Sequence, residues 1–353
     1  KDETAAREWF EQASKLDNPH AQYQLARMIF NDPSSTPEQT AQALERLTKA
    51  AEAGQDCAQY ALGKIYRDGQ GVEKDIQKAV ALFTLAATKE NSFAAFALGK
   101  LYLAGDAALP RDPAAALKWL TYAAELGNQF AQYRLGKLLL KGDDGIPKDV
   151  ITAIRWLTAA AKQENGYAEY ALALVYLTGE DAPKDSVKAL SLLKRSAGRG
   201  NQFAQYRLGK LLLQGEDAPK DVKAAIRWLT AAAEQGNQYA QYALGKLYLL
   251  GKEVPKDRSS AIKWFQLAAD QGNEYAQYFL KHMDDRLGQP PVAAVISLFH
   301  HLANIFQEQN QPPPSGGVRV AVDRKLLRKI KAKKIAQGHK ADDHEKIPQY
   351  SQR

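Results

Sequence analysis

Small and apolar residues recur along the first four-fifths of the chain with a period of 36 or 37 residues. An alanine marks the start of each unit: Ala21, Ala58, Ala94, Ala131, Ala168, Ala204, Ala240 and Ala276. From that alanine, apolar positions recur at i, i+4 and i+8, which predicts a helix of about three turns (helix A). Helix A is followed by a glycine and, in five copies, by a proline. An aspartate suited to cap a helix comes next, and a second apolar stretch (helix B) follows it.

Two antiparallel helices of this length cannot bury their own apolar stripes, but helix pairs stacked on one another can. The sequence therefore predicts an all-α solenoid of about eight helix pairs over residues 1–285. A glycine or alanine follows the central leucine of helix A in seven of eight copies, which predicts two backbones in close approach. All five tryptophans lie 12 residues before a repeat alanine, and we interpret them as wedges between repeats: Trp9, Trp119, Trp156, Trp228 and Trp264.

The pattern Ala-x-Tyr-x-Leu-Gly-x-x-Tyr, followed by Gly, Asp, Ala-x-x-Trp and Ala-Ala-x-x-Gly-Asn, resembles the Sel-one-like repeat, a relative of the tetratricopeptide repeat. The resemblance covers roughly residues 1–285 and implies a right-handed superhelix that works as an interaction scaffold. The first unit departs from the pattern at residues 31–37, where Thr36 and Gln39 are expected to form a capping box. Residues 1–20 have the pattern of helix B without a preceding helix A, so we expect the chain to be a piece of a larger protein.

An aromatic row and a basic row are expected on helix A, at the third and seventh positions counted from the repeat alanine. These positions form the predicted partner-binding face: Tyr23, Tyr60, Lys64, Phe96, Lys100, Tyr133, Lys137, Tyr170, Tyr206, Lys210, Tyr242 and Lys246. The face would suit an acidic or extended peptide, or a nucleic-acid backbone. In the alternative, the rings pack against adjacent helices and the ammonium groups only reach solvent. Residues 1–311 carry a net charge of only +1, which favours a protein partner.

The end of the chain has a different character. Apolar residues at helical spacing predict a capping helix within 286–311, and a Pro/Gly-rich linker covers 312–322. Residues 323–353 form a basic amphipathic tail, and residues 312–353 carry +7 of the chain's total charge of +8. Seven cations are the candidates for contact with a nucleic-acid backbone: Arg324, Lys325, Arg328, Lys329, Lys331, Lys333 and Lys334. A solvated tail and a membrane-surface segment are the alternatives.

Residues of about 240–353, with His300-His301 and the segment 337–345 after the basic run, resemble the C-terminal region of mobilisation relaxases of bacterial conjugative elements. The resemblance implies a parent protein that nicks DNA, with its nuclease domain upstream of Lys1. Relaxases of that kind use a His-hydrophobe-His metal site and a nucleophilic Tyr, and this chain has no such triplet. We therefore expect a non-catalytic scaffold. The alternative is a free-standing adaptor in bacterial signalling or host interaction, without a DNA role.

Composition narrows the choice of function further. The 45% hydrophobic and 25% charged residues are typical of soluble globular proteins. Cys57 is the sole cysteine, which excludes an internal disulfide framework and favours the cytoplasm; we expect it to be buried and inert. No apolar run reaches the roughly 18 residues of a membrane span, and no phosphate-binding loop or catalytic triad pattern is present. No metal site or cofactor is predicted, because the ligand-type side chains at 339–345 lie in a tail without supporting groups.

Overall fold

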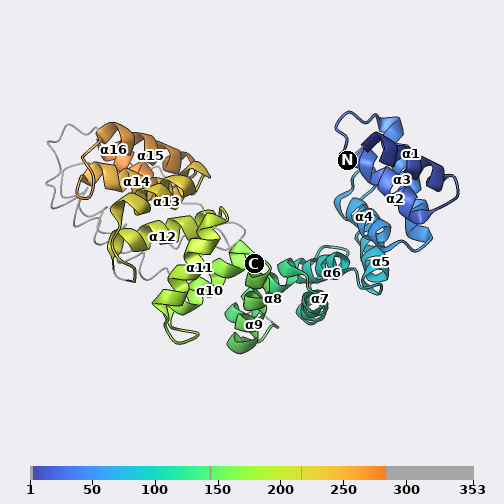
Figure 1. Cartoon of the computed structure of the whole chain (residues 1–353), viewed down its shortest axis with the longest axis horizontal. Coiled ribbons are helices and arrows are strands. Elements are labelled where there is room, and N and C mark those ends of the chain that lie inside the picture. The colour runs from blue at the N-terminus through green and yellow to red at the C-terminus, as the bar shows by residue number, and fades with distance from the viewer. Residues whose placement is uncertain (1–2, 143–144, 216, 284–353) are drawn as a thin grey trace, which may run out of the picture. The chain divides into compact units, whose positions relative to one another are not determined.

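The computed structural model describes residues 3–142, 145–215 and 217–283. These residues form 16 α-helices and no strand, and the helices follow one another in chain order from α1 to α16 (Figure 1). The bounds are α1 (Glu3–Ser14), α2 (Pro19–Asn31), α3 (Pro37–Glu52), α4 (Asp56–Asp68), α5 (Ile76–Ala87), α6 (Ser92–Ala104), α7 (Pro113–Glu125), α8 (Gln129–Lys141), α9 (Val150–Lys162), α10 (Gly166–Thr178), α11 (Ser186–Gly198), α12 (Gln202–Gln214), α13 (Val222–Glu234), α14 (Gln238–Leu250), α15 (Arg258–Asp270) and α16 (Glu274–Met283). The all-α prediction is confirmed: even-numbered helices are helix A and odd-numbered helices are helix B.

Capping side chains set the helix boundaries. The aspartate before each helix B from α5 onward accepts a hydrogen bond from a backbone N–H of the first turn, as Asp149 does from Thr152 at 3.0 Å. Asparagine caps most of the A helices in the same way, as Asn165 does at 3.0 Å from Ala168. The predicted capping box is present, with Thr36 and Gln39 each accepting from the backbone of the other. A short polar side chain at most helix starts therefore accounts for the recurring boundaries that the sequence shows.

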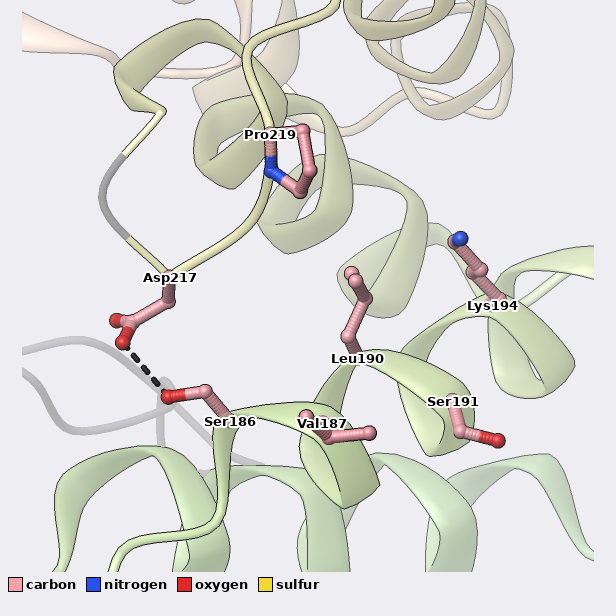
Figure 2. A pocket seen from close by; sticks show the side chains of 7 residues that line it. All are labelled: Ser186, Val187, Leu190, Ser191, Lys194, Asp217 and Pro219. Atoms are coloured by element: carbon pink, nitrogen blue, oxygen red, sulfur yellow. Dashed lines mark hydrogen bonds between the residues drawn. The ribbon is translucent and has the colours of Figure 1, made fainter.

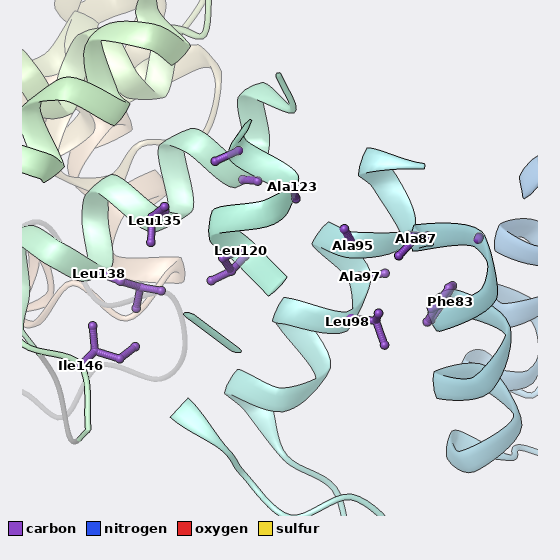
Figure 3. Close-up of a cluster of buried hydrophobic side chains, with 14 of the residues drawn as sticks. Phe83, Ala87, Ala95, Ala97, Leu98, Leu120, Ala123, Leu135, Leu138 and Ile146 are labelled. Carbon is purple, nitrogen blue, oxygen red and sulfur yellow. The ribbon is translucent and has the colours of Figure 1, made fainter. Parts of the chain in front are cut away.

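The core is a series of clusters of alanine and leucine side chains from both kinds of helix. Figure 3 shows part of one cluster, to which Leu120 of α7, Leu135 of α8 and Ile146 of the following loop contribute. Each fully buried leucine stabilises the fold by about 1.5–3 kcal/mol relative to an exposed one. Because every cluster is built from neighbouring repeats, the stability of the solenoid comes from contacts between successive helices.

The recurring glycine of helix A makes room mainly for a side chain rather than for a second backbone. A Cβ built on Gly136 of α8 would lie 2.6 Å from Leu157 Cγ of α9 and 3.1 Å from the backbone oxygen of Ala153. The atoms that lie nearest to a Cβ built on Gly63, at 2.7–3.3 Å, belong to the ring of Phe83. The expected close approach of two backbones is present at Gly136, and the glycine in addition accepts the leucine or phenylalanine that helix B inserts.

Replacing Gly136 by leucine is expected to destabilise the fold by about 1–3 kcal/mol, because a leucine cannot share this space with Leu157. Alanine is the matched control. Its clash is smaller and is offset by about 1 kcal/mol of helix propensity, and the chain itself carries alanine at the equivalent positions Ala26 and Ala173. Urea unfolding would measure both variants. Equal midpoints for Gly136→Leu and Gly136→Ala would contradict this account of the glycine.

Four of the five tryptophans pack as predicted. Trp119 and Trp156 lie against the cluster of buried residues between 79 and 153, and Trp228 and Trp264 lie against the clusters that precede them. Trp9 departs from the pattern, since 72% of it is exposed. It belongs to α1, the first described helix.

The other predicted segments lie outside the described residues. All described residues belong to the first of two units into which the chain divides, residues 1–284. The capping helix of 286–311, the linker of 312–322 and the tail of 323–353 therefore stay predictions. Within the described part, no helix is long and apolar enough to cross a membrane.

Candidate partner-binding face

One face of helix A carries all the predicted binding residues. Counting the repeat alanine as position 1, positions 0, 3, 4, 7 and 11 lie within one arc of the helix, because each residue advances by about 100°. The buried alanine and leucine at positions 1 and 5 lie on the other side of the helix. We call this arc, taken over all even-numbered helices, the helix A face.

The predicted aromatic row is half of a continuous ladder. From Tyr60 to Tyr242, each ring at position 3 lies against the ring at position 0 of the next helix A, with centroids 5.9–6.4 Å apart. The aromatic ladder consists of the pairs Tyr60–Phe93, Phe96–Phe130, Tyr133–Tyr167, Tyr170–Phe203, Tyr206–Tyr239 and Tyr242–Tyr275. These contacts join successive repeats along the face.

The position 3 rings are largely packed, while three rings at position 0 reach solvent. Burial raises the pKa of Tyr133 and of Tyr206 to about 12. By contrast, Phe93, Phe130 and Tyr167 are 51%, 49% and 55% exposed. The face predicted from the sequence comprised positions 3 and 7 and did not include these rings. The available signal was an aromatic residue directly before most repeat alanines.

The predicted lysines lie beside the ladder, and several sit over its rings. The Nζ atoms of Lys64, Lys100 and Lys137 are 5.8–5.9 Å from the centroid of the position 3 ring on the same helix. Such contacts contribute about 0.5–1 kcal/mol at exposed sites. Lys64 and Lys100 are exposed, whereas Lys137, Lys210 and Lys246 are half-buried.

Mutual repulsion among cations marks two places on the face. Burial lowers the pKa of Lys137, and the charges of Arg134 and Lys141 lower it further. Burial likewise lowers the pKa of Lys246, with added repulsion from Lys210 and Lys252. A negatively charged ligand placed there would relieve this repulsion.

Arg134 and Arg207 are functional candidates that the sequence reading missed. Both stand at position 4, in segments 128–140 and 201–213, which are identical in sequence. The Nε atom of each is buried and has no hydrogen-bond partner in the described part of the chain. The two arginines belong to the same face as the lysines because positions 3, 4 and 7 lie within one arc of the helix.

At the N-terminal part of the face the ladder changes. Cys57 stands at position 0 of α4, where most other repeats have a ring, and burial is the main cause that raises the pKa of Tyr23. Cys57 is partly exposed, so the expectation that it is buried was wrong. Partial burial, and then the charge of Asp56, raise the pKa of the Cys57 thiol, which disfavours the reactive thiolate.

An open pocket lies away from the helix A face, between α11 and the loop before α13. Figure 2 shows Val187 and Leu190 of α11 facing Pro219, with Ser186 Oγ donating to Asp217 Oδ1 at 2.8 Å. None of the predicted site residues lines it. Among the described residues, no group of three or more His, Cys, Asp and Glu side chains could hold a metal ion.

Comparisons with known proteins agree with the repeat pattern. The family model of the Sel1 repeat matches residues 1–18, 19–55, 58–91, 92–128, 129–165, 166–201, 202–237 and 238–273. The crystal structure of c5321, a protective antigen of uropathogenic Escherichia coli with an SLR fold, is 34% identical over 80% of this chain, with a TM-score of 0.68. The chain spans 60% of the length of c5321.

A second solved structure, a Sel1 repeat protein from Oxalobacter formigenes, is 30% identical over 65% of this chain and 94% of its own, with a TM-score of 0.60. No curated relative matches the chain. Together with the 16 helices, these similarities establish a superhelical solenoid.

Proposed function

The chain belongs to the Sel1 repeat family of interaction scaffolds, and from that premise we propose that its helix A face binds an extended, acidic segment of a partner protein. Members of the family are in general non-catalytic.

The charge of the face is the observation that carries this proposal. From α6 to α14, the face positions hold the cations Lys100, Arg134, Lys137, Lys141, Arg207, Lys210 and Lys246 and no acidic residue. The aromatic ladder supplies rigid apolar area beside these charges, and aromatic residues commonly anchor protein interfaces. An extended acidic segment can use both.

A charge-matched pair of variants tests the proposal. The face variant replaces Lys100, Lys137, Lys210 and Lys246 by glutamine. The control variant replaces four exposed cations that directly precede the tryptophans of helix B: Lys118, Arg155, Arg227 and Lys263. Both variants lose four positive charges, so they differ only in where the charge is removed.

Peptides selected by the wild-type chain from a random display library are expected to be rich in Asp and Glu. Their affinity should fall at least about fourfold in the face variant, because rim charges contribute roughly 0.2–1 kcal/mol each, or about 0.8–4 kcal/mol for four. It should change little in the control. Equal losses in both variants would show a general charge effect and contradict the proposal.

We also propose, as a narrower hypothesis, that the cations of the tail contact the backbone of DNA or a partner in a DNA-transfer complex. The net charge of +7 in residues 312–353 supports it, together with the resemblance to relaxases. The competing hypothesis is an adaptor in signalling or host interaction that uses the helix A face alone. Binding of DNA by the tail separates the two.

A further inference from the structure

The cations of the helix A face are not evenly distributed. Helix α8 contributes three of them, Arg134, Lys137 and Lys141, and α12 contributes Arg207 and Lys210. Helix α10 lies between these two in the chain and contributes none, since Ala171 and Leu174 stand at positions 4 and 7. The basic row is therefore divided into two clusters.

The interval between the clusters is apolar and aromatic. Tyr167 of α10 is about half exposed, and its ring lies 5.9 Å from that of Tyr133. On the other side, Tyr170 stacks on Phe203 of α12 at 6.3 Å. Leu174 is half-buried beside them. The face thus alternates along the solenoid as basic, apolar and basic.

The two basic clusters match each other closely. Helices α8 and α12 have the same sequence over residues 129–140 and 202–213, and in both the arginine at position 4 has a buried Nε without a hydrogen-bond partner in the described residues. Guanidinium groups suit carboxylates in particular, because their planar donors fit two oxygens. Two similar basic clusters with an apolar interval would select a partner in which carboxylates alternate with apolar residues in the same way.

We propose that the helix A face between α8 and α12 binds an extended peptide segment in which two acidic clusters flank an apolar pair. This inference rests on the proposed function. Helices in contact lie about 8–10 Å apart, so α8 and α12, each touching α10 through the ladder, are separated by roughly 16–20 Å. An extended chain covers about 3.3 Å per residue, which places the two acidic clusters about five or six residues apart.

Two synthetic peptides of equal composition and charge test the pattern. The spaced peptide is Glu-Glu-Ser-Leu-Leu-Ser-Glu-Glu, and the contiguous peptide is Leu-Ser-Glu-Glu-Glu-Glu-Ser-Leu. Fluorescence anisotropy with the full chain is expected to show about tenfold tighter binding of the spaced peptide. Equal binding of both peptides would overturn this inference and leave the proposed function standing. Binding of neither peptide above the level of the four-lysine face variant would count against both.

Variants in the face locate the effect. Leu174→Lys places in the interval the residue that other repeats carry at position 7, so the fold should tolerate it. It is expected to improve binding of the contiguous peptide and to abolish the preference. The matched pairs Arg134→Gln with Lys137→Gln, and Arg207→Gln with Lys210→Gln, should each reduce affinity for the spaced peptide by a similar factor. An unchanged preference in Leu174→Lys would overturn the assignment of the interval to α10.

Discussion

Replacing Arg195 by methionine is expected to lower the free energy of unfolding by about 3 kcal/mol, the low end for leaving a buried charge without its partner. The carboxylate of Glu169 is fully buried, and its Oε1 lies 2.5 Å from a guanidinium nitrogen of Arg195. Arg199 also reaches Glu169 at 3.3 Å and keeps part of the compensation, so the loss stays at that low end. Chemical unfolding of the variant measures it.

The reason for this arrangement lies in the other repeats. At position 2 most A helices carry a glutamine whose amide donates to the backbone oxygen eight residues earlier, as Gln132 does to Ala124 at 3.0 Å. Glu169 has no N–H to donate. Arg195 instead donates to the equivalent oxygen, that of Ala161, at 3.3 Å, and also pairs with the carboxylate. Arg195 thus donates the hydrogen bond that the glutamine amide donates in other repeats, and it also compensates the negative charge of Glu169.

A double variant provides the control. Glu169→Gln restores the residue found in most other repeats, so the free energy of unfolding of Glu169→Gln with Arg195→Met should be within about 1 kcal/mol of the wild type. The coupling between the two sites is then at least about 2 kcal/mol. If Arg195→Met cost the same free energy whether Glu169 or glutamine is present, the compensation described here would be wrong.

The helices and their ends could be predicted from the sequence because each depends on local chemistry. Asp149 caps α9 through its own first turn, and the 36-residue period repeats this signal many times. The pairing of Glu169, which stands where most repeats have glutamine, could not be predicted from local chemistry. Its partner Arg195 lies 26 residues later on another helix. A contact between helices of one repeat leaves no periodic trace when it occurs once.

The candidate face was predicted in part for a similar reason. Positions 3 and 7 were found because a tyrosine recurs at position 3 in seven of the eight copies and a lysine at position 7 in five. An arginine stands at position 4 in only two copies, as Arg134 and Arg207. The exposure of the rings at position 0 depends on contacts with neighbouring helices, which the sequence does not show. Under the proposed function, variation between repeats, rather than the consensus, would set the selectivity of this scaffold.

Deleting residues 318–353 is expected to abolish most salt-sensitive DNA binding and to leave thermal stability nearly unchanged. The seven cations between Arg324 and Lys334 would neutralise about seven phosphates, which gives a slope of about −6 for the logarithm of affinity against the logarithm of salt concentration. Between 50 and 200 mM salt, affinity for duplex DNA should then fall roughly 10³- to 10⁴-fold, whatever the base sequence. Stability should hold because the deleted segment has few apolar side chains to contribute to a core.

Titration of a labelled duplex at several salt concentrations measures the slope for the full and truncated chains. The four-cation control variant of helix B tests for a general charge effect, because it changes net charge without touching the tail. A truncated chain that binds DNA as tightly as the full chain, and loses this binding in the four-lysine face variant, would move the nucleic-acid contact to the helix A face. If no version of the chain binds DNA at near-physiological salt, the adaptor hypothesis would be favoured. The charge of the tail would then be insufficient to bind DNA through counterion release.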